Sequence, residues 1–206
     1  MQRDEIINSL IEKFGFKRYL EIGIGDGLNY QRIKCEYKTN VDPFFDKRSG
    51  QTDHFLPINM MTSDEFFASN KEKFDIIFVD GLHTFEQTLT DIMNSLECLN
   101  EGGIVIAHDM LPPTEWHQRD SNEKEGGEWN GTCWKAVAYL RTTNPNLTIH
   151  TVDSDWGTAI IRKGESKLFE KKFDEIDYSF FRSNKWELMN IISVEKFKDI
   201  YVKGNI

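Results

Sequence analysis

Apolar residues along this chain follow two alternating patterns. Some segments repeat apolar side chains every three or four positions, as amphipathic helices do, and between them lie short, continuously apolar runs typical of buried strands. The continuous runs predict strands over residues 18–22, 40–43, 56–60, 74–80, 104–107, 147–152 and 157–162. The periodic segments predict helices over residues 6–14, 30–35, 62–71, 84–99 and 134–140. Strands that alternate with helices indicate an α/β fold with a doubly wound, mostly parallel sheet.

Short polar motifs mark where several of these elements begin and end. Thr62 precedes Glu65 by three residues, and Thr84 precedes Gln87 by three, which is the spacing of a capping box at a helix start. The glycine pair at residues 102–103 is expected to stop the helix that Thr84 opens.

The remaining segments are expected to complete one domain. Residues 112–131 contain two prolines and three glycines, and we expect them to form a long loop near the functional site. The tail over residues 165–206 is rich in aromatic side chains and is expected to pack back onto a core over residues 17–162. A length of 206 residues is most simply one domain spanning residues 1–206. The chain could still form a homo-oligomer or belong to a longer polypeptide.

Composition and charge narrow the class of protein. Hydrophobic residues make up 39% of the chain, enough for a core of normal size. The net charge of −9, with Lys and Arg scattered, argues against a nucleic-acid partner. The three cysteines lie far apart and form no C-x-x-C motif, so neither a disulfide framework nor a thiolate zinc site is indicated. With no leader-like start and no apolar run long enough to span a membrane, we expect a cytoplasmic protein with no membrane partner.

The first predicted strand runs directly into a glycine-rich turn. Residues 19–27 read Y-L-E-I-G-I-G-D-G. Such a turn brings backbone N–H groups against a ligand. A dinucleotide-binding turn requires G-x-G-x-x-G, but Leu28 or Tyr30 stands where its third glycine should be, depending on where the count starts. The spacing therefore argues against a nicotinamide or flavin cofactor.

The same turn carries the pattern E-x-G-x-G-x-G, which resembles the first motif of class I S-adenosylmethionine-dependent methyltransferases. The resemblance implies that S-adenosylmethionine is the cofactor. It also implies that the turn approaches the methionine part and the ribose of that donor through Glu21, Gly23, Gly25 and Gly27.

Polar residues near this turn and after later strands add possible contacts to the donor. Asp42 ends the second predicted strand, where a carboxylate can accept both hydrogens of a ribose diol. Asp26, inside the turn, could bind the methionine amino group or only stabilise the turn. Ser63 and Asp64 follow the third predicted strand, where they could contact the adenine or only cap the helix.

A second group of candidates follows the fourth and fifth predicted strands. Asp80 and His83 come at and after the end of one strand, and His108 and Asp109 follow the next. Ligands of open α/β sheets bind at the carboxyl ends of the strands, so neighbouring strands would bring these side chains into one crevice. Each residue alone could be a surface or capping residue, but their joint placement favours a functional site.

The chemistry of this group points to a cation and a base. Two carboxylates in close proximity repel each other, and a divalent cation would relieve the repulsion. Oxygen ligands from Asp80 and Asp109 suit Mg²⁺, and His108 as a further metal ligand would suit Mn²⁺. The imidazole of His83 can remove a proton near neutral pH.

Residues 74–86, with Asp91 beyond them, resemble the D-G-x-H-x-[YF]-E region of a class I methyltransferase family that includes metal-dependent sugar O-methyltransferases from macrolide and glycan pathways. Residues 102–109, 134–137 and 151–157 resemble later segments of that family. The resemblance, over roughly residues 17–162, implies a Rossmann-like, seven-stranded fold, a Mg²⁺ held by Asp80 and Asp109, and His83 as general base. In the macrolide sugar enzymes the residue before the second Asp is an acidic metal ligand, whereas this chain has His108.

We therefore expect an S-adenosylmethionine-dependent O-methyltransferase that acts on a hydroxyl of a sugar or glycan. Trp116, His117 and Trp129 in the long loop would cover this acceptor. Two alternatives stay open: a metal-independent methyltransferase for another small molecule, such as a phenol or amine, and a cofactor-binding domain without turnover.

Overall fold

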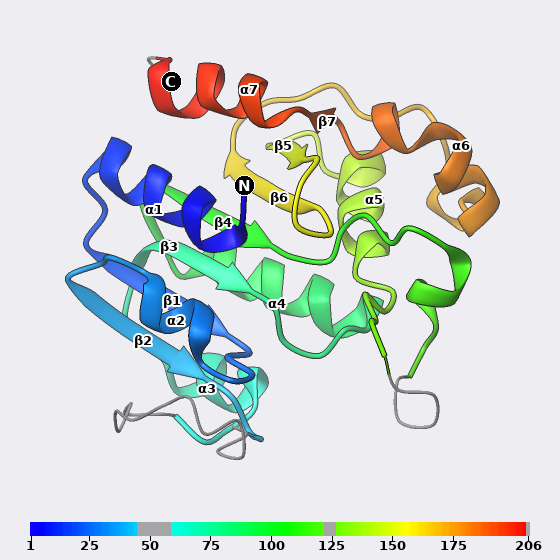
Figure 1. Ribbon diagram of the computed structural model, residues 1–206. Coiled ribbons are helices and arrows are strands. Elements are labelled where there is room, and N and C mark those ends of the chain that lie inside the picture. The colour runs from blue at the N-terminus through cyan, green and yellow to red at the C-terminus, as the bar shows by residue number, and fades with distance from the viewer. Residues whose placement is uncertain (45–58, 122–126, 205–206) are drawn as a thin grey trace.

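The computed structural model describes residues 1–44, 59–121 and 127–204. Its centre is a seven-stranded sheet with the strand order β2-β1-β3-β4-β6-β5-β7 (Figure 1). Neighbours among the first four strands of that order are parallel, and β6 runs antiparallel to both β4 and β5. The strands are β1 (Arg18–Ile22), β2 (Tyr37–Val41), β3 (Phe74–Val79), β4 (Leu99–Ala107), β5 (Leu147–Val152), β6 (Thr158–Lys163) and β7 (Ile191–Ile192). The predicted fold class, a mostly parallel seven-stranded α/β sheet, is confirmed.

Helices cover both faces of the sheet. They are α1 (Arg3–Phe14), α2 (Leu28–Arg32), α3 (Ser63–Ser69), α4 (Phe85–Glu97), α5 (Trp134–Thr143), α6 (Tyr178–Leu188) and α7 (Val194–Phe197), with 3₁₀ turns η2 (Glu115–Gln118) and η3 (Phe173–Glu175) and a π-helical segment η4 (Lys198–Lys203). Within the described part of the chain, no helix has both the length and the apolar character needed to cross a membrane.

Alternate residues of the central strands face two separate apolar clusters, as expected for strands buried on both faces. Leu20, Ile77 and Val105 pack in one cluster with α3, α4, α5 and α6. Tyr19 and Ile76 pack in the other with α1, α2 and the C-terminal segment of α7 and η4. Figure 1 shows α1 in blue and α7 in red near each other, so the two ends of the chain help to cover the same face. The C-terminal segment of α7 and η4 therefore packs on the same face of the sheet as α1.

Several predicted boundaries hold and others shift. The predicted strands at residues 18–22 and 147–152 match β1 and β5, and Gly15 ends α1 in the left-handed conformation. The second strand lies earlier than expected and ends at Val41, just before Asp42. The strand predicted over residues 56–60 lies largely outside the described residues, although Asn59 forms a single parallel bridge to Val41. The last strand of the sheet, β7, instead comes from the tail.

The predicted helix over residues 84–99 is too long. Helix α4 ends at Glu97, and Leu99 already pairs with Phe74 as the first residue of β4. The glycine pair lies inside β4, where the pairing with β3 shifts register. A Cβ on Gly103 would lie 2.9 Å from the Asp75 carbonyl oxygen, so this close approach of two strands requires glycine there.

Candidate functional site

The carboxyl ends of β1, β3 and β4 lie side by side and place the candidate residues at one edge of the sheet. Ile22 pairs with Val79, and Val79 pairs with Ala107. The ladder continues one residue further, because the Asp80 N–H donates to the Ile22 carbonyl (2.9 Å) and the His108 N–H donates to the Val79 carbonyl (3.1 Å). Since β1 has β2 on one side and β3 on the other, this edge is also where the strand order reverses, the usual ligand position in such sheets.

The glycine turn fits tightly against this edge. Gly23 has a φ of +79°, and a Cβ there would lie 2.2 Å from the Asp80 carbonyl oxygen. Gly25 also has a positive φ, +49°, but a Cβ there would meet nothing within 4 Å. The first glycine is therefore required for packing against β3, whereas the second leaves open space beside the turn. Gly27 is the N-terminal cap of α2, and Asp26 Oδ1 accepts the Leu28 N–H at 3.0 Å.

Asp42 is tied to the glycine turn rather than left in solvent. Its Oδ2 accepts the N–H groups of Ile24 (2.9 Å) and Gly25 (3.2 Å), and its Oδ1 accepts the Phe44 N–H (2.7 Å). A carboxylate has about four acceptor sites, so these three bonds fix its orientation and leave one lone pair, on Oδ1, free to accept.

Glu21 is almost completely buried beneath the same turn. It accepts hydrogen bonds from the Tyr19 hydroxyl and from the Asn29 amide (3.2 Å). Burial raises the pKa of Glu21 to about 8, against the opposing effect of these hydrogen bonds. This acid is therefore protonated more readily than an exposed glutamate.

A polar network lies at the start of α3 and α4. Gln87 Nε2 lies 3.2 Å from Ser63 Oγ, 3.1 Å from Asp64 Oδ1 and 3.0 Å from Asp91 Oδ1. Thr62 and Glu65 form the predicted capping box. At the start of α4 only half of the predicted box forms: the Thr84 side chain accepts the Gln87 N–H, but the Gln87 side chain bonds to this network instead. Burial raises the pKa of Asp91 to about 6. Gln87 thereby links the two residues predicted to lie near an adenine ring.

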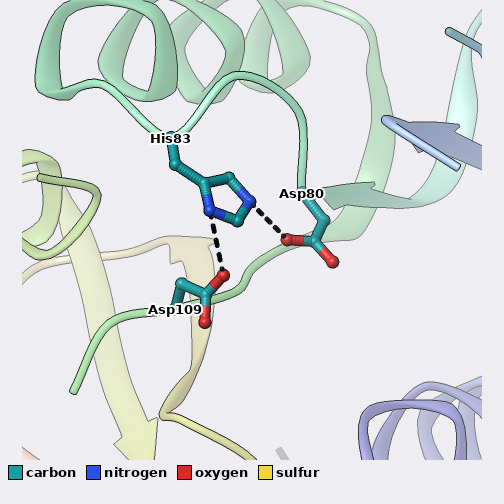
Figure 2. Close-up of side chains that lie close together, drawn as sticks. All are labelled: Asp80, His83 and Asp109. Carbon is teal, nitrogen blue, oxygen red and sulfur yellow. Dashed lines mark ion pairs between the residues drawn. The ribbon is translucent and has the colours of Figure 1, made fainter. Parts of the chain in front are cut away.

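Asp80, His83 and Asp109 converge at the carboxyl ends of β3 and β4 (Figure 2). His83 Nε2 lies 3.3 Å from Asp80 Oδ1, and His83 Nδ1 lies 3.4 Å from Asp109 Oδ2. Each of the three offers a ligand atom, and these atoms all lie within 4.8 Å of one another. Asp109 adopts a φ of +63°, which is uncommon for a residue with a side chain.

His108 lies close to the same two carboxylates. Its Nδ1 lies 3.4 Å from Asp80 Oδ1 and 3.5 Å from Asp109 Oδ2, while its Nε2 donates to the Asp155 carbonyl oxygen at 2.7 Å. Burial lowers the pKa of His108, but Asp80, Asp109 and Asp155 outweigh it and raise that pKa well above its ordinary value. Burial likewise opposes, but does not cancel, the effect of Asp80 and Asp109, which raise the pKa of His83.

Arg3 reaches this cluster from α1, which the sequence did not suggest. Its Nη1 lies 2.8 Å from Asp80 Oδ2, and its Nε lies 2.8 Å from Asp155 Oδ2. Burial would raise the pKa of Asp80, but His108 and His83 hold it well below its ordinary value. The cluster thus brings basic and acidic side chains into contact, and Arg3, Asp80 and His83 among them are partly buried. No local motif could have revealed the contact between Arg3 and Asp80, because 77 positions separate them.

The loop that follows β4 folds over His83. The His83 Nδ1 lies 3.2 Å from the Trp129 carbonyl oxygen, and the two rings pack with centroids 5.0 Å apart. The Asn130 amide donates to Asp109 Oδ1 at 2.6 Å, and its own Oδ1 is buried with no hydrogen-bond partner among the described residues. Trp129 was predicted to lie near an acceptor, whereas Asn130 was missed because an asparagine in a polar loop carries no distinctive signal.

One cavity of about 730 Å³ joins these features. Its lining includes residues of the glycine turn, the polar network and the Asp80–His83–Asp109 cluster: Glu21, Gly23, Gly25, Asp26, Asp42, Ser63, Asp64, Gln87, Asp80, His83, His108, Asp109, Trp129 and Trp156. Its size is within the usual range for small-molecule sites. Gly27, Trp116 and His117 are not among the lining residues, although the His117 ring packs against Trp156.

Comparison with known proteins agrees with this architecture. Residues 20–110 match a family model described as a methyltransferase domain. No curated protein matches the chain by sequence.

Solved structures of methyltransferases share the fold. A Staphylococcus aureus protein provisionally named caffeoyl-CoA O-methyltransferase has a TM-score of 0.58 and 21% identity, over 78% of this chain and 82% of that one. The SAH-bound methyltransferase PaMTH1 of Podospora anserina has a TM-score of 0.57 and 16% identity, over 79% and 78%. The O-methyltransferase TomG of Streptomyces achromogenes, in complex with SAM, has a TM-score of 0.56 and 11% identity, over 79% of each chain. At these identities the likeness shows the Rossmann-like methyltransferase fold, and the domain match supports a methyltransferase.

Proposed function

We propose that this protein is an S-adenosylmethionine-dependent O-methyltransferase that transfers a methyl group to a hydroxyl of a sugar or glycan. In this proposal Asp80, Asp109 and His108 hold a divalent cation, and His83 removes the hydroxyl proton. The observation that carries it is the convergence of Asp80, His83 and Asp109 in the same cavity as the glycine turn. A donor site and a proton-accepting site in one cavity are what methyl transfer to a hydroxyl requires.

The donor half of the cavity fits S-adenosylmethionine. The open space beside Gly25 allows a ligand to approach the backbone of the turn, and the remaining acceptor site of Asp42 can take a hydrogen bond from a ribose hydroxyl. Ser63, Asp64 and Gln87 supply polar groups at the part of the cavity where the adenine would lie. The solved SAM- and SAH-bound methyltransferases of the same fold support this choice of donor.

The cluster also fits a divalent cation. Two carboxylate oxygens and an imidazole nitrogen are ligands that Mn²⁺ accepts, and the carboxylates alone suit Mg²⁺. His108 would bind the cation in its neutral form, with its proton on Nε2 and its Nδ1 near Asp80 Oδ1 and Asp109 Oδ2, which leaves His83 for the proton. When bound, the cation would polarise a hydroxyl oxygen of the acceptor and lower its pKa.

The chain's own residues supply the remaining chemistry. A proton on His83 Nδ1 would be donated to the Trp129 carbonyl oxygen, which leaves Nε2 as the atom that accepts the proton of the acceptor hydroxyl. The hydroxyl oxygen then attacks the methyl carbon of the sulfonium. A new C–O bond forms as the C–S bond breaks, and its electron pair stays on sulfur. Alignment of the two substrates in one cavity supplies much of the acceleration.

The overall charge favours a small-molecule or glycan acceptor. A net charge of −9 would repel the phosphate backbone of a nucleic acid. We therefore propose a small acceptor that enters the cavity beside Trp129. We also propose that the chain acts as one domain.

A second candidate is methyl transfer without a metal. Arg3 already places a positive charge 2.8 Å from Asp80 Oδ2, and a fixed charge there lowers the affinity of the cluster for a cation. In that case His83 alone would activate the acceptor, and a phenol, which is a stronger acid than a sugar hydroxyl, would be the more suitable substrate.

The test is methyl transfer from S-adenosylmethionine to a panel of methyl glycosides and simple phenols, with and without EDTA, by the wild type, His83→Ala and Asp80→Ala. The proposal expects glycoside methylation that EDTA abolishes and that both substitutions reduce strongly. Methylation of phenols alone, unaffected by EDTA, would favour the second candidate. Full activity of both variants would refute the roles given to His83 and Asp80.

A further inference from the structure

The turn between β5 and β6 has an unusual backbone. Asp155, Trp156 and Gly157 adopt φ values of +47°, +62° and +88°, so three successive residues are left-handed. Left-handed conformations are unfavourable for residues with a Cβ, and a bulky side chain there is uncommon. Such a backbone persists only where the surrounding structure holds it.

Four sets of contacts hold this turn in place. The Arg3 side chain and backbone N–H bind the Asp155 carboxylate, and His108 Nε2 binds the Asp155 carbonyl oxygen. The Leu111 N–H donates to the Trp156 carbonyl oxygen at 2.8 Å, and the Met110 N–H donates to that of Gly157 at 3.0 Å. The anchors come from α1, from the end of β4 and from the segment after it, so elements far apart in sequence combine to impose the conformation.

Trp156, which lies in this turn, is one of the residues that line the cavity. Trp156 is only partly buried, whereas Trp134, a core tryptophan of the same chain, is completely buried. The His117 ring packs against Trp156 with centroids 5.7 Å apart and an interplanar angle of 33°, which supports the indole. Trp129, which packs on His83, lines the same cavity.

We infer that Trp156 is the platform on which the ring of the acceptor stacks, and that it selects cyclic acceptors such as pyranosides over open-chain polyols. This inference rests on the proposed function and names the acceptor class of the same site. An indole offers a wide apolar face to the C–H face of a sugar ring, while the ring's hydroxyls remain free for the polar cluster. Asp155, which precedes Trp156 in the chain, is hydrogen-bonded to His108, and this contact fixes the position of Trp156 relative to the cluster.

The experiment measures binding, so that it does not depend on turnover. Methyl glucoside, methyl mannoside and methyl rhamnoside are titrated, alongside the open-chain polyol sorbitol, into protein saturated with S-adenosylhomocysteine, and binding is followed by saturation-transfer NMR. The proteins are the wild type, Trp156→Ala, Trp156→Phe and the control Trp186→Ala. Trp186 lies on α6, is 59% exposed and is not among the residues that line the cavity. Circular dichroism and the affinity for S-adenosylhomocysteine report whether each variant is folded.

The wild type is expected to bind at least one glycoside more tightly than sorbitol. Trp156→Ala should weaken that binding by about tenfold, Trp156→Phe should restore most of it, and Trp186→Ala should leave it unchanged. Equal binding by folded Trp156→Ala and wild type, or a wild type that binds none of the glycosides, would overturn the inference. If glycosides bind through Trp156 but are never methylated, the proposed function fails and the platform stands.

If Trp156→Ala does not fold, Trp156→Phe and Trp156→Leu decide the question. Both fill part of the indole volume, but only phenylalanine keeps an aromatic face. Glycoside binding that is retained by the first and lost by the second supports the inference, and equal binding by the two contradicts it.

Discussion

The glycine turn offers a matched pair of substitutions that separates packing from ligand binding. In Gly23→Ala the new methyl group would lie 2.2 Å from the Asp80 carbonyl oxygen, at a φ of +79°. The left-handed backbone and the forced overlap together should cost about 2–5 kcal/mol of folding free energy. In Gly25→Ala the φ is +49° and nothing lies within 4 Å, so only the backbone cost of about 1–2 kcal/mol is expected.

The assay is thermal unfolding together with calorimetric titration of S-adenosylmethionine. For a protein of this length we expect the midpoint to fall by roughly 10 °C for Gly23→Ala and by roughly 3–6 °C for Gly25→Ala. Gly25→Ala should nevertheless lose most of its donor affinity, because its methyl group enters the space beside the turn. Equal stability of the two variants would refute the packing argument. Undiminished donor affinity in Gly25→Ala would refute the placement of the donor.

Three further predictions concern individual side chains. In the folded state the pKa of Glu21 is about 8, whereas that of an ordinary glutamate is near 4.5. The folded state therefore holds the proton more tightly, and the contribution of Glu21 to the free energy of unfolding decreases as the pH rises from about 4.5 to about 8. Glu21→Gln should therefore become more stable relative to the wild type as the pH rises through that range, by on the order of a few kcal/mol. If urea unfolding gives the same difference in free energy between the two proteins at every pH, the prediction is wrong. Asp42→Asn should weaken donor binding by roughly 10–100-fold in calorimetry, because a charged hydrogen-bond acceptor is lost, and unchanged affinity would remove Asp42 from the donor site. Asp109→Ala should weaken Mn²⁺ binding, followed by electron paramagnetic resonance, by about a hundredfold or more, while Glu128→Ala, a change of another acidic residue lining the cavity, should not.

The sequence predicts the layers of the fold well because local signals suffice for them. Short apolar runs such as F-D-I-I-F-V are typical of buried strands, and a glycine after Phe14 ends a helix for stereochemical reasons. The convergence of Asp80 with Asp109 also follows from the rule that carboxyl ends of parallel strands meet at one edge. The error at Leu99 arose because apolar periodicity continued past the end of α4 into a strand that must be apolar as well.

The side chains that complete the site could not be predicted in the same way. Arg3 contacts Asp80 and Asp155 only because α1 packs over the face of the sheet beside them. Trp156 lines the cavity from a left-handed turn that is held by contacts from three other segments. Gln87 has the sequence spacing of a capping box, but its side chain forms hydrogen bonds with Ser63, Asp64 and Asp91 instead of capping the helix. Each of these outcomes depends on tertiary contacts that no local pattern contains.

The central claim is that the glycine turn and the cluster of Asp80, His83 and Asp109 are two halves of one methyl-transfer site. The most direct test is a crystal structure with S-adenosylhomocysteine and Mn²⁺, with anomalous scattering used to locate the metal. The account predicts the product along residues 23–27 with its sulfur turned toward His83, and a manganese peak between Asp80 and Asp109. A product bound away from the glycine turn, or a cluster that holds no manganese, would contradict it.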